Sequence, residues 1–76
     1  MENLKNIKSV QVFLAVANFG NATRAAAFLN TSQSSVSYHI KKLEDEVGIP
    51  LFERTPTGLV LTEEGGVLAS YAERGF

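Results

Sequence analysis

The 76-residue sequence predicts a mainly α-helical fold, and three observations lead to this prediction. Apolar residues recur at helical spacing in four segments, and the second and third of these are short and joined by a short polar break. A Gly-Ile-Pro sequence stops the third segment. Two short apolar runs then flank a turn that contains Pro and Gly. Together these features predict a winged helix-turn-helix with a three-helix core and a two-stranded wing, followed by a linker helix.

The first helix is expected over residues 4–19. Its apolar stripe recurs at steps of three and four residues and consists of Ile7, Val10, Phe13, Leu14 and Ala17, widened by Val12 and Val16. Such a wide stripe is typical of a helix that is covered on more than one side. Gly20 is the expected C-terminal stop, because glycine adopts a left-handed conformation at low cost.

The second and third helices are expected over residues 22–29 and 33–47. Asn21 and Ser32 are their expected N-caps, and Asn30 and Thr31 form the turn between them. The second helix is expected to pack through Ala25, Ala26 and Leu29, and the third through Val36, Ile40, Leu43 and Val47. The opposite face of the third helix carries Ser34, Tyr38, Lys41 and Asp45, with Ser37 beside them. Gly48 and Pro50 end the third helix.

The predicted wing consists of Leu51-Phe52 and Leu59-Val60-Leu61, joined by a turn over residues 53–58. Thr62 is the expected cap of the fourth helix, whose apolar face carries Val67, Leu68, Tyr71 and Ala72. A domain this small has little core left for that face to cover. We therefore predict a helix–helix homodimer through Val67, Leu68 and Tyr71, with residues 1–61 as the winged domain and 62–76 as the linker or dimerisation helix.

Composition excludes several classes of protein. The chain has no cysteine and one histidine, so we expect no disulfide, metal site or cofactor. No apolar run approaches the ~20 residues of a membrane span, and we expect a cytoplasmic protein without membrane contact. The net charge of −1 argues against a nucleic-acid partner, but residues 3–43 hold five basic and no acidic residues, whereas residues 44–76 hold two basic and seven acidic ones. Phosphate attraction depends on this local pattern.

The N-terminal half of the third helix is the candidate DNA-reading segment. Gln33 can pair with adenine through two hydrogen bonds, and the serine hydroxyls can donate or accept. Tyr38 can contact a phosphate or a thymine methyl, and Lys41 and Lys42 can neutralise phosphates. The alternative is an ordinary solvated helix face.

Further candidates flank that helix. Thr23 and Arg24 begin the second helix, where backbone N–H groups can hold a phosphate; the alternatives are a local cap for Thr23 and a solvated charge for Arg24. Arg54, Thr55 and Thr57 in the wing are candidates for minor-groove or phosphate contacts. A surface ion pair of Arg54 with Glu53 or Glu63 is the alternative there.

Catalysis finds little support in the residues. His39 follows Ser35 by four positions on one helix face, but a serine nucleophile also needs an orienting acid and an oxyanion site, and nothing else supplies them. The acidic run at residues 44–46 is interpreted as the solvated end of the third helix. We therefore expect no enzyme, and the second hypothesis is a winged-helix module that binds protein in place of DNA.

The run from residue 25 to residue 65 resembles the DNA-binding domain of LysR-type transcriptional regulators. The family's fixed spacings are matched by Ala25, Ala26, Leu29, Ser32, Gln33, Val36, Ser37, Ile40, Leu43, Glu44, Val47, Gly48, Leu51, Phe52, Arg54, Leu61, Thr62 and Gly65. The resemblance implies that the third helix enters the major groove of double-stranded DNA. It implies that Gln33, Ser34, Ser37 and Tyr38 face bases or nearby phosphates.

The resemblance also implies an assembly. Linker helices of two subunits would pair in antiparallel fashion, and dimers, or tetramers of the full-length protein, would bind imperfect inverted repeats. A small-molecule effector would act only through a C-terminal domain, so the chain resembles a piece of a longer regulator. The sequence departs from the pattern at five positions. Ala22 stands where an aromatic residue is frequent, Ser34 where proline is frequent, and Tyr38 where arginine is frequent. Thr57 and Gly58 stand where the family wing usually carries a second basic residue. These departures suggest a weaker hold on phosphate and a distinct sequence preference.

Overall fold

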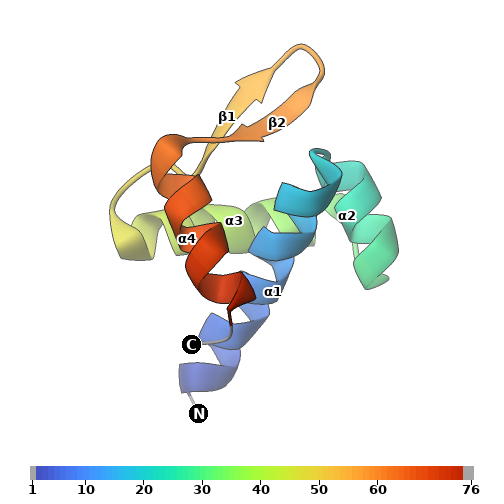
Figure 1. Cartoon of the computed structure of the whole chain (residues 1–76). Coiled ribbons are helices and arrows are strands. Elements are labelled where there is room, and N and C mark those ends of the chain that lie inside the picture. The colour runs from blue at the N-terminus through green and yellow to red at the C-terminus, as the bar shows by residue number, and fades with distance from the viewer. Residues whose placement is uncertain (1, 75–76) are drawn as a thin grey trace.

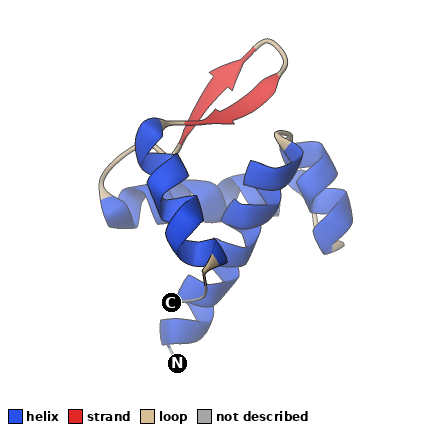
Figure 2. Cartoon of the chain, viewed as in Figure 1, coloured by secondary structure: helices blue, strands red, loops and turns tan. Residues whose placement is uncertain are grey.

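The computed structural model describes the backbone of residues 2–74 and the side chains of residues 8–74 (Figure 1). Along this part of the chain the elements are α1 (Glu2–Phe19), α2 (Ala22–Leu29), α3 (Gln33–Val47), β1 (Phe52–Thr55), β2 (Gly58–Leu61) and α4 (Glu63–Glu73). Helices form the body, and the hairpin projects from it as a wing (Figure 2). The predicted winged helix-turn-helix fold is confirmed.

Three helices begin at the caps that the sequence predicts. The side chains of Asn21, Ser32 and Thr62 each accept a hydrogen bond from the backbone N–H three residues later, at 3.0, 3.1 and 2.9 Å respectively. Gly20 and Gly48, with φ of 65° and 79°, end α1 and α3 in the left-handed conformation as expected. These local signals fix the helix boundaries because each satisfies backbone groups that the helix ends leave free.

The core is built around α1, which contacts α2, α3, α4 and β2. The buried side chains are those of Ser9, Val12, Phe13, Ala15, Val16, Ala25, Ala26, Val36, Ile40, Leu43, Leu51, Ala69 and Ala72. The predicted stripe of α1 is therefore only partly right, since Val10, Leu14 and Ala17 are half-buried. Burial is centred on positions that face several neighbouring elements at once, which a single stripe does not anticipate. The side chain of Ile7 lies outside the described residues.

Two predictions about helix faces are wrong. Val47 is 44% exposed, because it is the last residue of α3 and the chain turns away at Gly48. On α4 the predicted apolar face is divided: Ala72 is buried with the small residues Gly65 and Ala69, and Leu68 packs half-buried against the core, whereas Val67 and Tyr71 are exposed. Small residues let α4 approach the body closely and leave Val67 and Tyr71 outside.

The wing is longer than the sequence predicts. Its strands are antiparallel and pair from Phe52 with Leu61 to Thr55 with Gly58, so that only Pro56 and Thr57 form the turn. Leu51 was expected in the first strand but precedes it, with 1% of its surface exposed. Polar residues at 53–55 enter the strand because the wing stands away from the core, where a polar strand surface is tolerated.

The wing is attached to the body through a backbone contact at two glycines. The Leu59 N–H donates to the Gly20 carbonyl at 3.0 Å. A Cβ built on Gly58 would lie 2.3 Å from that same carbonyl oxygen, and Gly58 has a φ of 140°. This contact fixes the wing beside the turn between α1 and α2. None of the described helices is long and apolar enough to cross a membrane.

We expect the Gly58→Ala substitution to lower the free energy of unfolding by about 3 kcal/mol, because the new Cβ meets backbone and the φ is strained. Urea denaturation measures this loss. Gly48→Ala is the matched control: it adds a Cβ at a positive φ but into open space, and costs only about 1 kcal/mol. Equal losses for the two variants would contradict the close contact at Gly58.

Candidate nucleic-acid interface

A groove lies between the N-terminal ends of α2 and α3 and the wing, and we call it the wing groove. Of the residues predicted to contact DNA, those that line it are Thr23, Gln33, Ser37, Arg54, Thr55 and Thr57. A second depression continues from Ser37 and Arg54 along α3 to Lys41 and Glu44. Residues from three separate segments of the sequence thus converge on one continuous surface.

Two helix N-termini meet in the wing groove. Asn21 caps α2, and Thr23 lies in the first turn of that helix, while Gln33 is the first residue of α3. Because Asn21 is the cap, the alternative role of Thr23 as a local cap is wrong. Free N–H groups and the positive ends of two helix dipoles favour an anion at this place. The exposed Arg24 lies next to Thr23 on α2 but does not line the groove.

The four residues predicted to face bases lie on two parts of α3. Gln33 and Ser37 face the wing and line the wing groove. Ser34 is exposed on the first turn, with its Oγ 3.3 Å from the Oγ of Ser32. Tyr38 is 62% exposed and lines a separate shallow depression along the outer face of α3. The surface offered by α3 is therefore wider than the groove alone.

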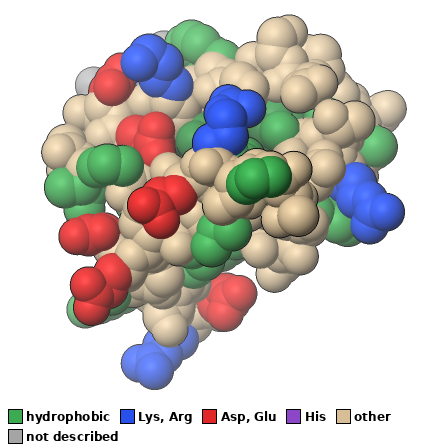
Figure 3. Space-filling view, turned by 90° about the horizontal axis from the view of Figure 1, so that it is seen from above, with side chains coloured by type: hydrophobic (Ala, Val, Ile, Leu, Met, Phe, Trp, Pro, Cys, Tyr) green, Lys and Arg blue, Asp and Glu red, His purple; other side chains and the backbone are tan. Residues whose placement is uncertain are grey.

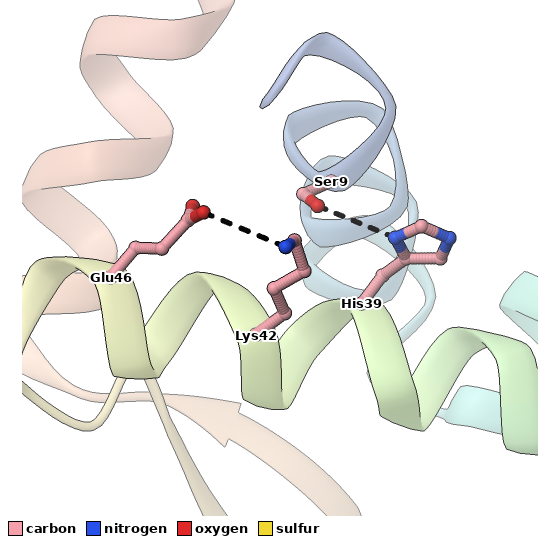
Figure 4. Close-up of polar contacts among 4 residues, drawn as sticks. All are labelled: Ser9, His39, Lys42 and Glu46. Atoms are coloured by element: carbon pink, nitrogen blue, oxygen red, sulfur yellow. Dashed lines mark hydrogen bonds and ion pairs between the residues drawn. The ribbon is translucent and has the colours of Figure 1, made fainter. Parts of the chain in front are cut away.

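The two lysines of α3 have different surroundings. Lys41 is exposed and borders the depression that holds Ser37 and Arg54. Lys42 is half-buried and does not line that depression, and its Nζ lies 3.9 Å from a carboxylate oxygen of Glu46 (Figure 4). An exposed i, i+4 pair of this kind contributes only a few tenths of a kcal/mol. It nevertheless partly neutralises Lys42, so Lys41 is the better-placed cation of the two.

The wing brings Arg54 to the groove without an ion pair to any side chain of residues 8–74. Among the described residues the one recorded ion pair joins Lys42 to Glu46, so Arg54 pairs with neither Glu53 nor Glu63. The Thr55 hydroxyl donates to the Gly58 carbonyl at 3.0 Å and thereby closes the turn. Thr55 consequently shapes the wing tip, and Thr57 remains exposed.

Charge is distributed unevenly over the face that carries the wing. Figure 3 shows most of the acidic side chains on the left and lower part of this face, with basic side chains among them as well as at the centre and right. The charged residues of the wing groove and its continuation are Arg54, Lys41 and Glu44. The groove itself is therefore weakly positive despite the acidic total.

His39 does not pair with Ser35. It is half-buried, and its Nδ1 lies 3.3 Å from the Oγ of Ser9, a buried residue of α1 (Figure 4). Its ring meets that of Tyr38 edge-on, with centroids 5.4 Å apart. The sequence pattern did not indicate Ser9, because a serine within an apolar run carries no signal of its partner. The described residues also contain no group of three His, Asp or Glu side chains that could hold a metal ion.

Glu44 has a role that the sequence interpretation missed. It was grouped with the solvated end of α3, but its Oε2 accepts hydrogen bonds from the backbone N–H groups of Leu51, at 2.7 Å, and Phe52, at 3.3 Å. Phe52 is the first residue of β1, and Leu51 directly precedes it. The carboxylate therefore ties α3 to the start of the wing, and Arg54 follows Phe52 by two residues. A pattern of sequence spacing does not reveal such a bond across seven residues.

The chain matches the family model described as bacterial regulatory helix-turn-helix protein, lysR family, over residues 7–66. It belongs to the LysR family. It is 46% identical over 68 residues to the uncharacterized HTH-type transcriptional regulator YwqM of Bacillus subtilis, covering 90% of this chain and 23% of that protein. It is 42% identical over 69 residues to the HTH-type transcriptional regulator GltR of the same organism, covering 91% of this chain and 23% of that protein.

Solved structures of LysR-family proteins resemble the fold described above. The chain in the crystal structure of the CbnR_DBD–DNA complex superimposes with a TM-score of 0.84 at 34% identity, covering 88% of this chain and 77% of that one. This LysR-family chain spans about a quarter of the length of YwqM and GltR, 23% of each. The comparison thus concerns one domain of those longer regulators.

We expect Glu44→Ala to lower the free energy of unfolding by about 2 kcal/mol, because two backbone N–H groups lose a charged acceptor. Thermal or urea unfolding measures the change. Asp45→Ala is the matched control, since Asp45 is an exposed neighbour, and its removal changes stability by less than about 0.5 kcal/mol. A Glu44→Ala effect as small as that of Asp45→Ala would show that the bond to the wing is unimportant.

Proposed function

We propose that this chain is a sequence-specific double-stranded DNA-binding domain of a bacterial transcriptional regulator. The observation that carries the proposal is the convergence of two helix N-termini, the exposed face of α3 and the unpaired Arg54 on one groove. Membership of the LysR family supports it, and so does the likeness to a domain solved in complex with DNA. The relatives are named as transcriptional regulators, and we infer a regulatory role in the cytoplasm without catalysis.

In this proposal α3 enters the major groove. Gln33 and Ser37 read base edges on the side of the wing, while Ser34 and Tyr38 contact bases or phosphates on the outer side. Lys41 and the N-terminus of α2, with Thr23 and Arg24, hold phosphates on either side of the groove. Lys42 contributes less, because Glu46 lies beside it.

The wing supplies the flanking contact. Arg54 is exposed on β1 and forms no ion pair with the described residues, so it can reach the sugar–phosphate backbone or the minor groove beside the α3 site. Thr57 at the wing tip and the backbone around Thr55 add polar contacts. With few cations in the interface, the affinity is expected to depend on shape and hydrogen bonds more than in strongly basic domains.

We also propose that residues 62–76 begin a dimerisation helix beyond the winged domain of residues 1–61. Val67 and Tyr71 are 59% and 66% exposed, and with Leu68 they border an apolar groove that is completed by Val47, Ile49 and Leu51. An exposed apolar strip of this kind is favourable to bury against a second copy. A symmetric pair of domains would bind an imperfect inverted repeat.

We expect Gln33→Ala to relax selectivity at one base position by about 1–3 kcal/mol, and Arg54→Gln to weaken binding to all sequences alike. The DNA is first selected from a random double-stranded pool with the wild-type chain. Fluorescence anisotropy titrations over a range of salt concentrations then measure affinity. The salt slope is the slope of the logarithm of the binding constant against the logarithm of salt concentration, and Arg54→Gln lowers its magnitude by about one unit.

Arg74→Gln is the charge-matched control, because Arg74 lies at the far end of α4, outside the wing groove. It leaves selectivity and salt slope unchanged. Failure of the wild-type chain to select any sequence at low salt would contradict DNA binding and favour a protein-binding module.

We expect Val67→Asp to abolish self-association, because it places a charge in the apolar strip of α4. Sedimentation velocity at increasing concentrations measures the monomer–dimer equilibrium. Val60→Asp is the matched control, since Val60 is similarly exposed at 50% but lies on the wing. Equal sedimentation of wild type and Val67→Asp at every concentration would contradict pairing through α4.

A further inference from the structure

The start of α4 rests directly on the backbone of Leu51. Gly65, in the first turn of α4, lies so close to Leu51 that an added Cβ would be 2.1 Å from the Leu51 carbonyl oxygen and 3.0 Å from its carbon. Gly65 is buried and helical, with no positive φ, so the absence of a side chain at this position serves close approach and not backbone conformation.

Thr62 joins the same place from the other side. Its N–H donates to the Leu51 carbonyl at 3.0 Å, and its hydroxyl donates to the Pro50 carbonyl at 2.8 Å. The same hydroxyl oxygen accepts the Gly65 N–H at 2.9 Å. The start of α4 is therefore bound to the segment that leads into the wing by two hydrogen bonds from Thr62 and by the backbone contact of Gly65, while the bond from Gly65 to Thr62 closes the first turn of the helix.

That segment is in turn bound to α3. Glu44 accepts the N–H groups of Leu51 and Phe52, as described above. The direction of α4 is thus defined relative to α3 through a short chain of contacts from Glu44 to Leu51 to Gly65. Figure 1 shows the result: α4 begins beside the base of the wing and runs back across the body.

We propose that the Gly65 contact with Leu51 sets the angle between α3 and α4, and thereby the spacing of the two half-sites that a dimer accepts. Gly65 and Thr62 are positioning residues in this account, because neither touches DNA nor lies on the exposed strip of α4. The inference rests on the proposed function, in which α3 reads DNA and α4 pairs two subunits. It adds a determinant of specificity that lies outside both surfaces.

The geometry of the contact gives the size of the change in half-site spacing that a side chain at Gly65 would cause. A Cβ at Gly65 requires about 1 Å of additional separation from Leu51, while Ala69 and Ala72 keep the rest of α4 on the body. Those residues lie about 6–10 Å further along the helix, so α4 tilts by about 7°. In a dimer with half-sites one turn apart, each α3 lies about 17 Å from the two-fold axis. The tilt then moves α3 of each subunit by about 2 Å, and the two displacements together change the preferred half-site spacing by about one base pair.

The half-site for this test is first selected with the wild-type chain. The DNA duplexes then each contain two inverted copies of that half-site, separated by spacers of different lengths. We expect the wild type to prefer one spacing, and the Gly65→Ala variant to prefer a spacing changed by about one base pair. At the original spacing we expect about tenfold weaker binding, which is the cost of modest DNA deformation, with affinity for a single half-site unchanged. A folded Gly65→Ala variant with the wild-type spacing preference overturns the proposal.

The next residue provides a matched control. Gly66→Ala makes the same change one position along α4, where a Cβ meets nothing within 4 Å, and it keeps the wild-type spacing. If Gly65→Ala does not fold, Thr62→Val takes its place, because it removes both hydrogen bonds of the hydroxyl; Thr62→Ser retains them. We expect Thr62→Val to bind several spacings nearly equally and Thr62→Ser to retain the single preference. A sharp wild-type preference in Thr62→Val overturns the proposal.

Two outcomes separate this inference from the proposed function. A wild-type chain that binds single half-sites without preferring any spacing overturns the inference and leaves DNA binding intact. A wild-type chain that binds no DNA overturns the proposed function. In that case residual dipolar couplings of the free chain still measure the angle between α3 and α4. The tilt is expected in Gly65→Ala and not in Gly66→Ala, and an unchanged angle in Gly65→Ala overturns the inference.

Discussion

The backbone of Leu51 is the point on which the arrangement of this domain depends. Its N–H is held by Glu44 of α3, its carbonyl by Thr62, and the same carbonyl is covered by Gly65 of α4. Its side chain is buried in the core. This one residue between α3 and the wing therefore fixes α3, β1 and α4 relative to each other. A side-chain group of α3 and a main-chain group of the α4 cap bond to its backbone, the first turn of α4 packs on its carbonyl, and β1 begins at the next residue.

The wing groove follows from this constraint and from the second attachment of the wing at Gly20 and Gly58. Because the wing is attached to the body both before β1 and at the start of β2, Arg54 lies across the wing groove from Gln33 and Ser37, although these residues are far apart in the sequence. The interface gains its positive potential from helix N-termini and two cations and not from net charge. This reconciles a total charge of −1 with a proposed polyanionic partner.

Local signals made most of the fold predictable from the sequence. Asn21, Ser32 and Thr62 as caps, with Gly20 and Gly48 as stops, place the helix boundaries, because capping involves residues only a few positions apart. Burial was less predictable wherever several elements meet, as on α1, or where the chain turns away, as at Val47. The residues that line the wing groove were predicted as DNA contacts from the chemistry of their side chains and from the resemblance to the family. The roles of Glu44 and Ser9 depend on long-range contacts that no periodicity reports.

The central claim is that DNA lies in the wing groove against the N-terminal half of α3. Titration of the ¹⁵N-labelled chain with a selected DNA duplex, followed by two-dimensional NMR, tests this claim most directly. The account predicts that the largest amide shifts map to Thr23, Gln33, Ser37 and Arg54, with small shifts in the exposed strip of α4 around Val67. Shifts concentrated on α4 or on the acidic end of α3, with the wing groove unaffected, would contradict it.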